Sequence, residues 1–456
     1  MLGVALAATL ALRWRVQQFT EKPALRHAAM VAAETARWQC WCTVKLVKHT
    51  ANCLGFPPNH SPPLFVPAHG FQDRFMATQI QRQTGRLAAL ESIRGMSALA
   101  VVFFHLAAIH VRLPDGLLSR LVGTLGQAVP VFFALSAFAL LYGYADRLFA
   151  GGGSAGLKHF YIRRVFRIMP LYLAVLSLFV IKSAMEDSFL STSKLLLNVL
   201  FLFPLIPGAH EGIVWASWSL GVEWLFYIAF PLTLLLAGNA RGCLVLLLLA
   251  MLVRVALLRF TDGAVPAADA MLSVVANLCF FAAGMTAFAV ARDARCQRVV
   301  SFVDRYGWAL FAGSAMLIVA WVATAAADSL TKLPGLGGAL FSAVLVLWLL
   351  WGYTGLPAAL DNAVTRFLGR ISYSLYLMHS LVLWGLSALG VFAWITAQVG
   401  AAYAGYWACA AVSVLAVLPV SYLMYRAAEK PGIALGERVL GSTRTAPVGG
   451  QPARQS

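Results

Sequence analysis

Apolar runs of roughly the length of a membrane-spanning helix recur from about residue 92 to residue 426, with short polar stretches between them. Most of them approach the ~20 residues that an α-helix needs to cross the hydrocarbon core of a bilayer. We therefore predict an all-α fold, a polytopic transmembrane helical bundle. The candidate segments are 92–111, 121–145, 168–184, 195–207, 215–237, 242–260, 268–291, 308–327, 335–356, 371–395 and 402–425.

The segment at 195–207 differs from the others. It is the shortest, and Pro204 and Pro207 interrupt it. A helix of that length reaches only ~20 Å, less than the ~30 Å of the hydrocarbon core. Basic residues gather in 147–167 and 292–305, and both regions face the cytoplasm only if 195–207 does not cross. We expect about 10 crossings, one short re-entrant or interfacial segment, and both termini in the cytoplasm.

Composition supports a membrane protein. Hydrophobic residues make up 60% of the 456 residues and charged residues only 12%, whereas soluble domains carry about 25% charged residues. The formal net charge of +17 comes from basic residues scattered between the apolar segments, as expected from the excess of Lys and Arg in cytoplasmic loops. The lipid bilayer is therefore an expected partner, and nucleic acid is not.

The chain divides into three parts. Residues 1–85 are expected to be a poorly ordered or non-native N-terminal extension, because Met76 opens a short polar lead into the first strong apolar segment. Residues 86–430 form the expected membrane domain. Residues 431–456 are rich in Gly, Ser, Thr, Arg and Pro, which predicts a disordered tail. The cysteines of the first part fit no standard zinc spacing, so no metal site is expected.

Four ionisable residues lie in or at the edge of apolar segments: Arg94, His105, Glu223 and His379. Such charges are costly near the bilayer centre and usually mark a buried pathway or a reaction site. Arg94 and His105 are eleven residues apart, nearly a whole number of turns, so they share one helix face with a rise of about 16 Å. A catalytic site, a transport path and a buried structural network are all compatible with these residues.

Five sequence blocks resemble the acyltransferase-3 family of integral membrane acyltransferases. They contain the family's arginine–histidine spacing, its arginine-x-x-arginine segment and its tryptophan-serine-leucine-x-x-glutamate motif, and they occur in family order over about 86–430. The resemblance implies about ten spans and transfer of an acyl group, most often acetyl from acetyl-CoA, to carbohydrate hydroxyls. The blocks are LESIRGMSALAVVFFHL (90–106), VPVFFALSAFALL (129–141), FYIRRVFRIMPLYL (160–173), WSLGVEWLFYIAFPL (218–232) and LGRISYSLYLMHSLVL (368–383).

Acyl transfer to a sugar needs a group that takes the hydroxyl proton. Neutral, partly desolvated His105 suits this general base. Glu223 is expected to orient His105, to stabilise its charged form or to hold the acceptor, and Arg94 completes the expected catalytic set. Direct transfer in a ternary complex is preferred, because no single Ser or Cys beside a base stands out.

The donor needs groups that bind phosphate. Arg163, Arg164 and Arg167 are expected to bind acyl-CoA at a cytoplasmic helix start, where guanidinium forks and the helix dipole both favour phosphate. Acyl-CoA is then a substrate, and no bound cofactor is expected. Residues expected to line the site are Tyr376, His379, Trp218 and Ser219.

A proton-coupled membrane transporter or exporter is the alternative, with His105, Glu223 and His379 as its proton path. Transporters usually contain repeats with interrupted helices in corresponding positions, and 195–207 is the one interrupted segment recognised in this sequence. The acyltransferase hypothesis is therefore preferred, with a surface, lipid-linked or exported glycan as acceptor. The Ala-rich composition and the family's distribution favour a bacterial inner (plasma) membrane.

Overall fold

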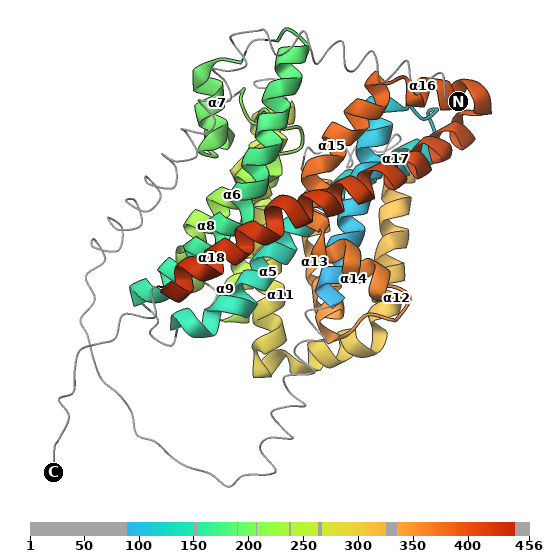
Figure 1. The fold of residues 1–456 in the computed structure, drawn as a ribbon. Helices are drawn as coiled ribbons and strands as arrows, with labels where there is room; N and C mark the ends of the chain where they lie inside the picture. Colours follow the sequence, from blue (N-terminus) through green and yellow to red (C-terminus); the bar gives the residue numbers. More distant parts are fainter. Residues whose placement is uncertain are drawn as a thin grey trace, which may run out of the picture.

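The computed structural model of the protein describes residues 89–149, 153–188, 190–206, 208–236, 239–262, 267–324 and 335–442. Within these ranges the regular structure is helical and contains no strand (Figure 1). The predicted all-α class is confirmed. The expected extension at 1–85, with Met76 and its cysteines, lies outside the described residues.

Eight helices in this part of the chain are long and apolar enough to cross a membrane, and a ninth is possible if a pair bent by 66° counts as one span. The protein is therefore an integral membrane protein. A further apolar helix of 19 residues, Trp218–Leu236, is not one of these eight spans. The eight spans are Ala89–His110, Leu117–Ala145, Gly156–Met185, Ala240–Phe260, Val274–Arg292, Ala294–Thr324, Leu336–Thr354 and Ala402–Gly441, and the bent pair is Ala363–Ala388 with Val391–Val399.

Most spans correspond to one or two helices. The first span ends in a π-helical turn, η1 (Leu106–His110). The helices that follow are α4 (Leu117–Thr124), α5 (Ala128–Phe149), α6 (Gly153–Met185), α7 (Thr192–Val199), α8 (Trp218–Leu236), α9 (Ala240–Phe260), α10 (Ala267–Leu272), α11 (Val274–Arg292), α12 (Gln297–Thr324), α13 (Leu336–Thr354), α14 (Ala363–Arg370), α15 (Ser372–Ala388), α16 (Val391–Val399), α17 (Ala402–Met424) and α18 (Lys430–Ser442).

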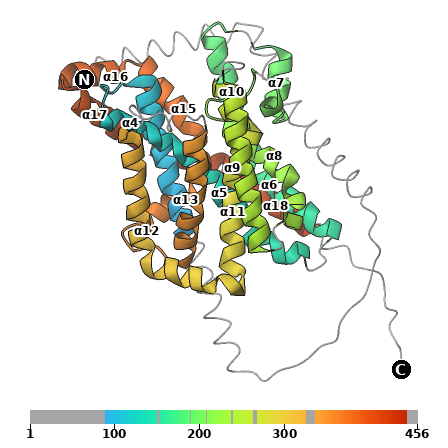
Figure 2. The same cartoon turned by 180° about the vertical axis from the view of Figure 1, so that it is seen from behind.

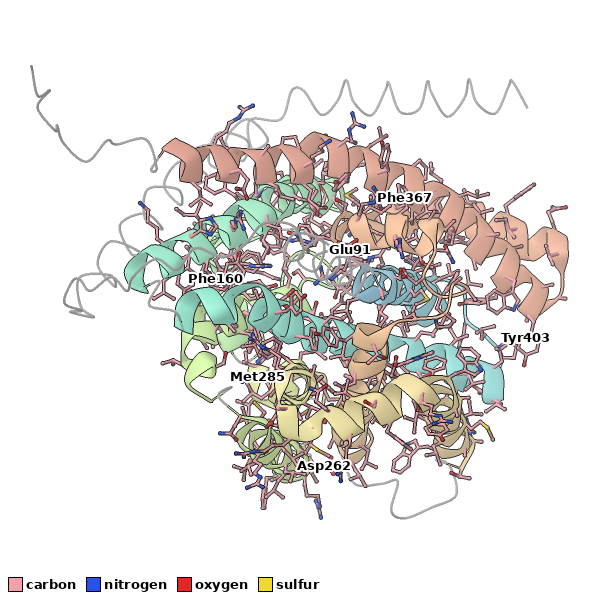
Figure 3. The ribbon with its side chains drawn as sticks, turned by 90° about the horizontal axis from the view of Figure 1, so that it is seen from below. Glu91, Phe160, Asp262, Met285, Phe367 and Tyr403 are labelled. Carbon is pink, nitrogen blue, oxygen red and sulfur yellow. The ribbon has the colours of Figure 1, made fainter. Side chains whose placement is uncertain are left out.

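The bundle has two distinct ends. The junction of α11 and α12 and the short helix α14 lie at one end, with Arg292, Arg295, Arg298, Arg366 and Arg370, and we call this the basic end. The short helices α4, α7, α10 and α16 lie at the opposite end, as two views from opposite sides agree (Figures 1 and 2). Seen from the basic end, the first span occupies the middle of the bundle, with Glu91 at its start (Figure 3).

The segment at 195–207 does not cross the bundle. Its described residues, 195–206, belong to the end of α7, the 3-10 turn η3 (Phe203–Leu205) and loop. Buried Asn198 holds this irregular backbone, since its Oδ1 accepts from Ile213 N at 2.7 Å and its carbonyl accepts from Tyr172 Oη at 3.3 Å. Irregular backbone at membrane depth requires such internal partners, because lipid offers none.

The C-terminal part differs from expectation. A π-helical turn, η6 (Tyr425–Glu429), joins α17 to α18, which packs against α6 and ends at Ser442. The predicted disordered tail is therefore wrong for residues 431–442, and residues 443–456 lie outside the described ranges. Gly432 and Gly436 explain the packing, because a Cβ at either would run into Phe166 or Pro170 of α6. Small residues spaced by four let membrane helices approach closely.

Candidate active site

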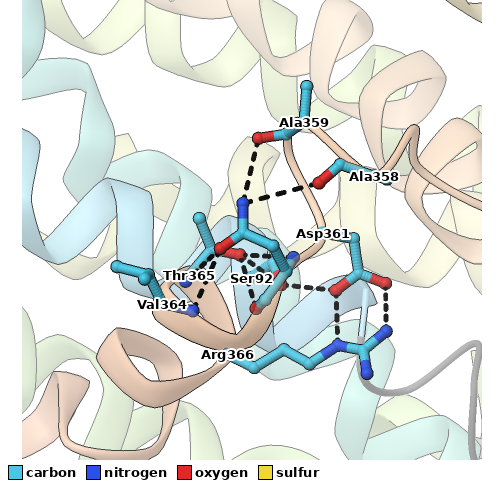
Figure 4. Close-up of polar contacts among 8 residues, drawn as sticks. Ser92, Ala358, Ala359, Asp361, Val364, Thr365 and Arg366 are labelled. Atoms are coloured by element: carbon cyan, nitrogen blue, oxygen red, sulfur yellow. Dashed lines mark hydrogen bonds and ion pairs between the residues drawn. The ribbon is translucent and has the colours of Figure 1, made fainter.

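α14 holds the first span in place near Arg94. Ser92 Oγ donates to Asp361 Oδ1 at 2.7 Å and accepts from Thr365 Oγ1 at 3.1 Å (Figure 4). The Arg366 guanidinium donates two bonds of 2.7 Å to the Asp361 carboxylate. The helices also touch closely, because a Cβ on Gly95 would meet the backbone of α14. This contact sets the position of the helix that carries both Arg94 and His105.

A cavity of about 70 Å³ lies between the first span, α5, α6, α8 and α15. Three guanidinium groups face one carboxylate across it, so the cavity is electropositive and favours an anion. Its polar lining is Arg94, Arg164, Arg167, Ser219, Glu223, Tyr227, Ser372, Tyr373 and Tyr376, and its apolar walls are Phe132, Phe133, Ile168 and Leu220. We call it the arginine cavity.

Aromatic rings surround Arg164. Its Cζ lies 5.7 Å from the ring centroid of Tyr144, 5.9 Å from that of Phe160 and 5.4 Å from that of Tyr227. Such cation–π contacts favour the guanidinium without using its hydrogen-bond donors. Its buried Nε has no hydrogen-bond partner among the described residues. A buried donor without a partner is costly, so Arg164 retains the capacity to bind an anionic ligand.

Glu223 belongs to the arginine cavity. It accepts a short hydrogen bond from Tyr227 Oη, which lies 2.9 Å from Ser136 Oγ of α5. Because Tyr227 gives its proton to Glu223, Ser136 must be the donor in the second bond. The described hydrogen bonds include none between Glu223 and His105, so the expectation that this carboxylate orients His105 has no support in the geometry. Glu223 instead lines the arginine cavity.

His105 contacts His379 instead. His379 Nε2 lies 3.1 Å from His105 Nδ1, and the ring centroids are 4.9 Å apart. His379 is fully buried, whereas His105 is partly exposed. The two residues come from the first span and α15, helices that are 274 positions apart in the chain.

The hydrogen bonds assign the protons of this pair in its neutral form. His379 Nδ1 lies 2.6 Å from the carbonyl of Tyr376, which can only accept, so Nδ1 carries the proton and Nε2 accepts. His105 Nδ1 must then donate to His379 Nε2, and it also lies 3.0 Å from the carbonyl of Val101. The lone pair of His105 Nε2 is left to take up a proton.

Tyr376 separates the arginine cavity from the histidine pair. Its Oη donates to Ala216 O at 2.8 Å and accepts from Ser219 Oγ at 2.6 Å. Its ring centroid lies 5.7 Å from that of His379 and, edge to face, 5.7 Å from that of Phe132. The expected site residues thus form two neighbouring groups that share one wall.

Two expected site residues lie elsewhere. Arg163 forms an ion pair with Glu437 of α18, with Nε and Oε1 2.9 Å apart, and Trp218 packs edge-on against Phe133 at 5.9 Å. Neither is among the residues that line the arginine cavity. The predicted helix start is also wrong, because α6 begins at Gly153, and the dipole effect falls off within the first turn.

Two residues were missed by the sequence analysis. Tyr227 lies four residues after Glu223, a spacing that places them side by side on a helix. Glu429 is only 1% exposed and accepts from Ser374 Oγ at 2.6 Å. Glu429 lies between the basic residues Arg426 and Lys430 in the sequence, and this local pattern gives no sign that its side chain is buried. No cluster of three metal-ligating side chains occurs among the described residues.

Comparison with known proteins identifies the family of this chain. A family model described as an acyltransferase domain matches residues 87–426. The protein ORF330 of Acidianus two-tailed virus, named as a proposed acetyltransferase, is 29% identical over 144 residues, which are 31% of this chain and 39% of that relative. No solved structure matches significantly. Since the family match extends over most of the chain and includes both groups of site residues, the chain belongs to the acyltransferase-3 family of membrane acyltransferases.

Proposed function

We propose that this acyltransferase moves an acyl group, in the first instance acetyl, from cytoplasmic acyl-CoA to a carbohydrate hydroxyl of a surface, lipid-linked or exported glycan. The observation that carries the proposal is the pairing of an arginine-lined cavity with a histidine pair along the same helix. Arg94 lines the arginine cavity and His105 belongs to the histidine pair, and the two residues are eleven positions apart on the first span.

Arg94, Arg164 and Arg167 are the proposed donor-binding groups. Guanidinium forks bind phosphate oxygens through paired hydrogen bonds. A cavity of about 70 Å³ is small, and it suits a phosphate group or a thioester. On this proposal the nucleotide lies outside the cavity, toward the basic end. On this arrangement the donor enters from the cytoplasm.

The separation of the two groups suits the shape of the donor. Eleven residues of helix give a rise of about 16 Å. The pantetheine arm of coenzyme A is comparable with about four extended residues, or roughly 14 Å. A donor whose phosphates bind the arginines would bring its thioester close to His105. The arm would pass Tyr376, whose ring stands between the two groups.

The proposed chemistry uses His105 Nε2 as the base. It takes the proton of the acceptor hydroxyl while the oxygen attacks the thioester carbonyl, and a new C–O bond forms. When the C–S bond breaks, the coenzyme A sulfur leaves and receives the proton from Nε2. His379 and the Val101 carbonyl accept from Nδ1–H and so favour the transient imidazolium. General base catalysis of this kind contributes typically ~10²–10⁴ in rate.

The test compares the acetyl ester content of surface glycans in cells that make wild-type protein, His105→Ala or no protein, with membrane levels matched by blotting. Loss of acetyl in both the null strain and His105→Ala is the expected result, and the altered glycan names the acceptor. Acetyl retained in His105→Ala but lost in the null strain would refute the base assignment. Acetyl unchanged in the null strain would refute the proposed substrate.

A further inference from the structure

Glu429 is a buried carboxylate outside the residues discussed so far as donor-binding or catalytic. It lies three residues beyond the end of the family match at residue 426 and outside the five sequence blocks that carry the family resemblance. It occupies the π-helical turn η6 between α17 and α18. Such turns are rare and frequently occur at functional sites. Here the turn directs an acidic side chain into the bundle.

The side chain lies close to residues that line the arginine cavity. Ser374 Oγ donates to Glu429 Oε2 at 2.6 Å, and Ser374 follows Tyr373, which lines the cavity. Ser372 and Tyr373, the two residues before Ser374 on α15, line the cavity together with Arg94 and Arg167, so Glu429 is held near these guanidinium groups. None of its described contacts within 4 Å is an ion pair with an arginine. Glu429 therefore acts on the cavity through its electrostatic field and not through a direct ion pair.

A second negative charge near the cavity would lower the electrostatic cost of its arginines when no donor is bound. Three arginines line it and Glu223 is the one carboxylate among its lining residues. Uncompensated buried charge is strongly unfavourable. When the carboxyl of Glu429 is ionised, water screens its charge little, because the residue is 1% exposed. The field of this charge then acts on the same guanidinium groups that would bind phosphate.

We propose that Glu429 is a positioning residue that sets the affinity of the arginine cavity for coenzyme A, by acting as a built-in counter-charge that competes with the donor's phosphates. The inference rests on the proposed donor. It predicts an effect opposite to that of a direct ligand, since removal of Glu429's charge should strengthen donor binding. Weaker retention of the product coenzyme A is the functional consequence of having this carboxylate.

The test is the affinity of the purified full-length protein for coenzyme A, measured by calorimetry in detergent or nanodiscs. Glu429→Gln keeps the shape and the hydrogen bond from Ser374, and Glu429→Met offers a similar volume without a polar group. Both should bind coenzyme A ~3- to 10-fold more tightly, because a nearby negative charge has been removed from a poorly screened site. The KM for acetyl-CoA should fall in parallel.

Glu91→Gln is the matched control. It removes the same charge at the basic end, but Glu91 is exposed, so solvent screens it and coenzyme A affinity should not change. Unchanged or weaker coenzyme A binding in both Glu429 variants would overturn the inference. If the variants differ from wild type only in a lower melting temperature, Glu429 has a structural role and the inference is likewise overturned. Failure of the wild-type protein to bind coenzyme A would overturn the proposed donor and this inference with it.

Discussion

The two histidines have different surroundings, and these assign different roles to them. His379 is fully buried and both of its ring nitrogens have partners, whereas His105 is partly exposed and keeps one lone pair. A base must reach its substrate. His105 therefore meets the requirement for proton transfer, and His379 holds the tautomer of its neighbour.

Replacement of His105 by Gln should lower kcat for acetyl transfer by ~10²–10⁴, the usual contribution of a general base. His379→Gln should cost no more than about tenfold, because it removes one hydrogen-bonding partner of His105 and not the base. Labelled acetyl transfer by reconstituted protein measures both. A loss in His379→Gln equal to or larger than that in His105→Gln would reverse the assignment.

Two adjacent arginines should respond differently to a conservative change. Arg164 lines the arginine cavity, whereas Arg163 is bound to Glu437 of α18. Lys keeps the charge but cannot make a planar two-bond contact with phosphate. Arg164→Lys should weaken coenzyme A binding about tenfold, and Arg163→Lys should leave it within about twofold, since a surface pair contributes little. Calorimetry with coenzyme A distinguishes them, and equal losses would contradict the geometry.

Contacts between helices decide how the residues of the first span are presented. α14 touches this span at Gly95, and the hydrogen-bonded group around Ser92 and Asp361 lies one turn earlier. The two contacts together fix the depth and rotation of the helix, and Arg94 and His105 move with it. The short helix α14 thus acts on the site through packing.

Gly95→Ala should destabilise the protein by ~1–3 kcal/mol, because its Cβ would overlap the backbone of α14 and force the helices apart. Gly123→Ala in α4 is the control, since nothing lies within 4 Å of the added Cβ, and alanine favours a helix over glycine. Thermal unfolding in detergent compares the variants. A Gly95→Ala protein as stable as Gly123→Ala would show that the helices do not pack as described.

Asp361 makes the α14 contact sensitive to pH. The Arg366 guanidinium and the Ser92 hydroxyl hold the pKa of this carboxyl below its usual range. A depressed folded-state pKa gives stability that is present above the unfolded pKa and lost as the pH falls through the folded value. The size should be at most ~1 kcal/mol, since Arg366 is 46% exposed and solvent screens the pair.

Asp361→Asn should therefore lower the melting temperature at pH 7, and the difference from wild type should shrink as the pH falls below about 4, near the unfolded pKa of Asp. Melting curves of both proteins over that pH range give the comparison. A difference that grows toward acid pH would have the wrong sign for this mechanism.

At the scale of the whole bundle, the proposed entry of the donor lies at the basic end. α18 lies near that end along α6, and α7 lies at the other (Figure 1). The excess of Lys and Arg predicts that the basic end faces the cytoplasm. Both the donor's route and the side from which a glycan arrives depend on this orientation.

Cysteine labelling tests the orientation. In a cysteine-free background, Ser193→Cys in α7 should react with an impermeant maleimide in intact cells, and Arg438→Cys in α18 only after the membrane is opened. Both side chains are exposed, so access to the thiol is not limited by burial. Labelling of Arg438→Cys in intact cells would place the basic end outside and would reject a cytoplasmic donor.

Local properties of the chain predicted much of the architecture. Apolar runs of sufficient length form spans because hydrocarbon cannot hydrogen-bond a backbone, so each segment must satisfy its own peptide groups. The same reasoning identified 195–207 as too short to cross. Arg94 and His105 were placed on one face because helical periodicity depends only on the spacing between them.

Contacts between helices that are distant in the sequence could not be predicted from these local properties. Helical periodicity fixes which residues share a face, but neither the depth at which a helix starts nor the neighbour it meets. α8 starts at Trp218 after a loop held by buried Asn198, and Glu223 therefore joins the arginines. His379, not Glu223, reaches His105 because α15 packs beside the first span. Which helices become neighbours depends on how their side chains pack together, and that packing exists only in the assembled bundle.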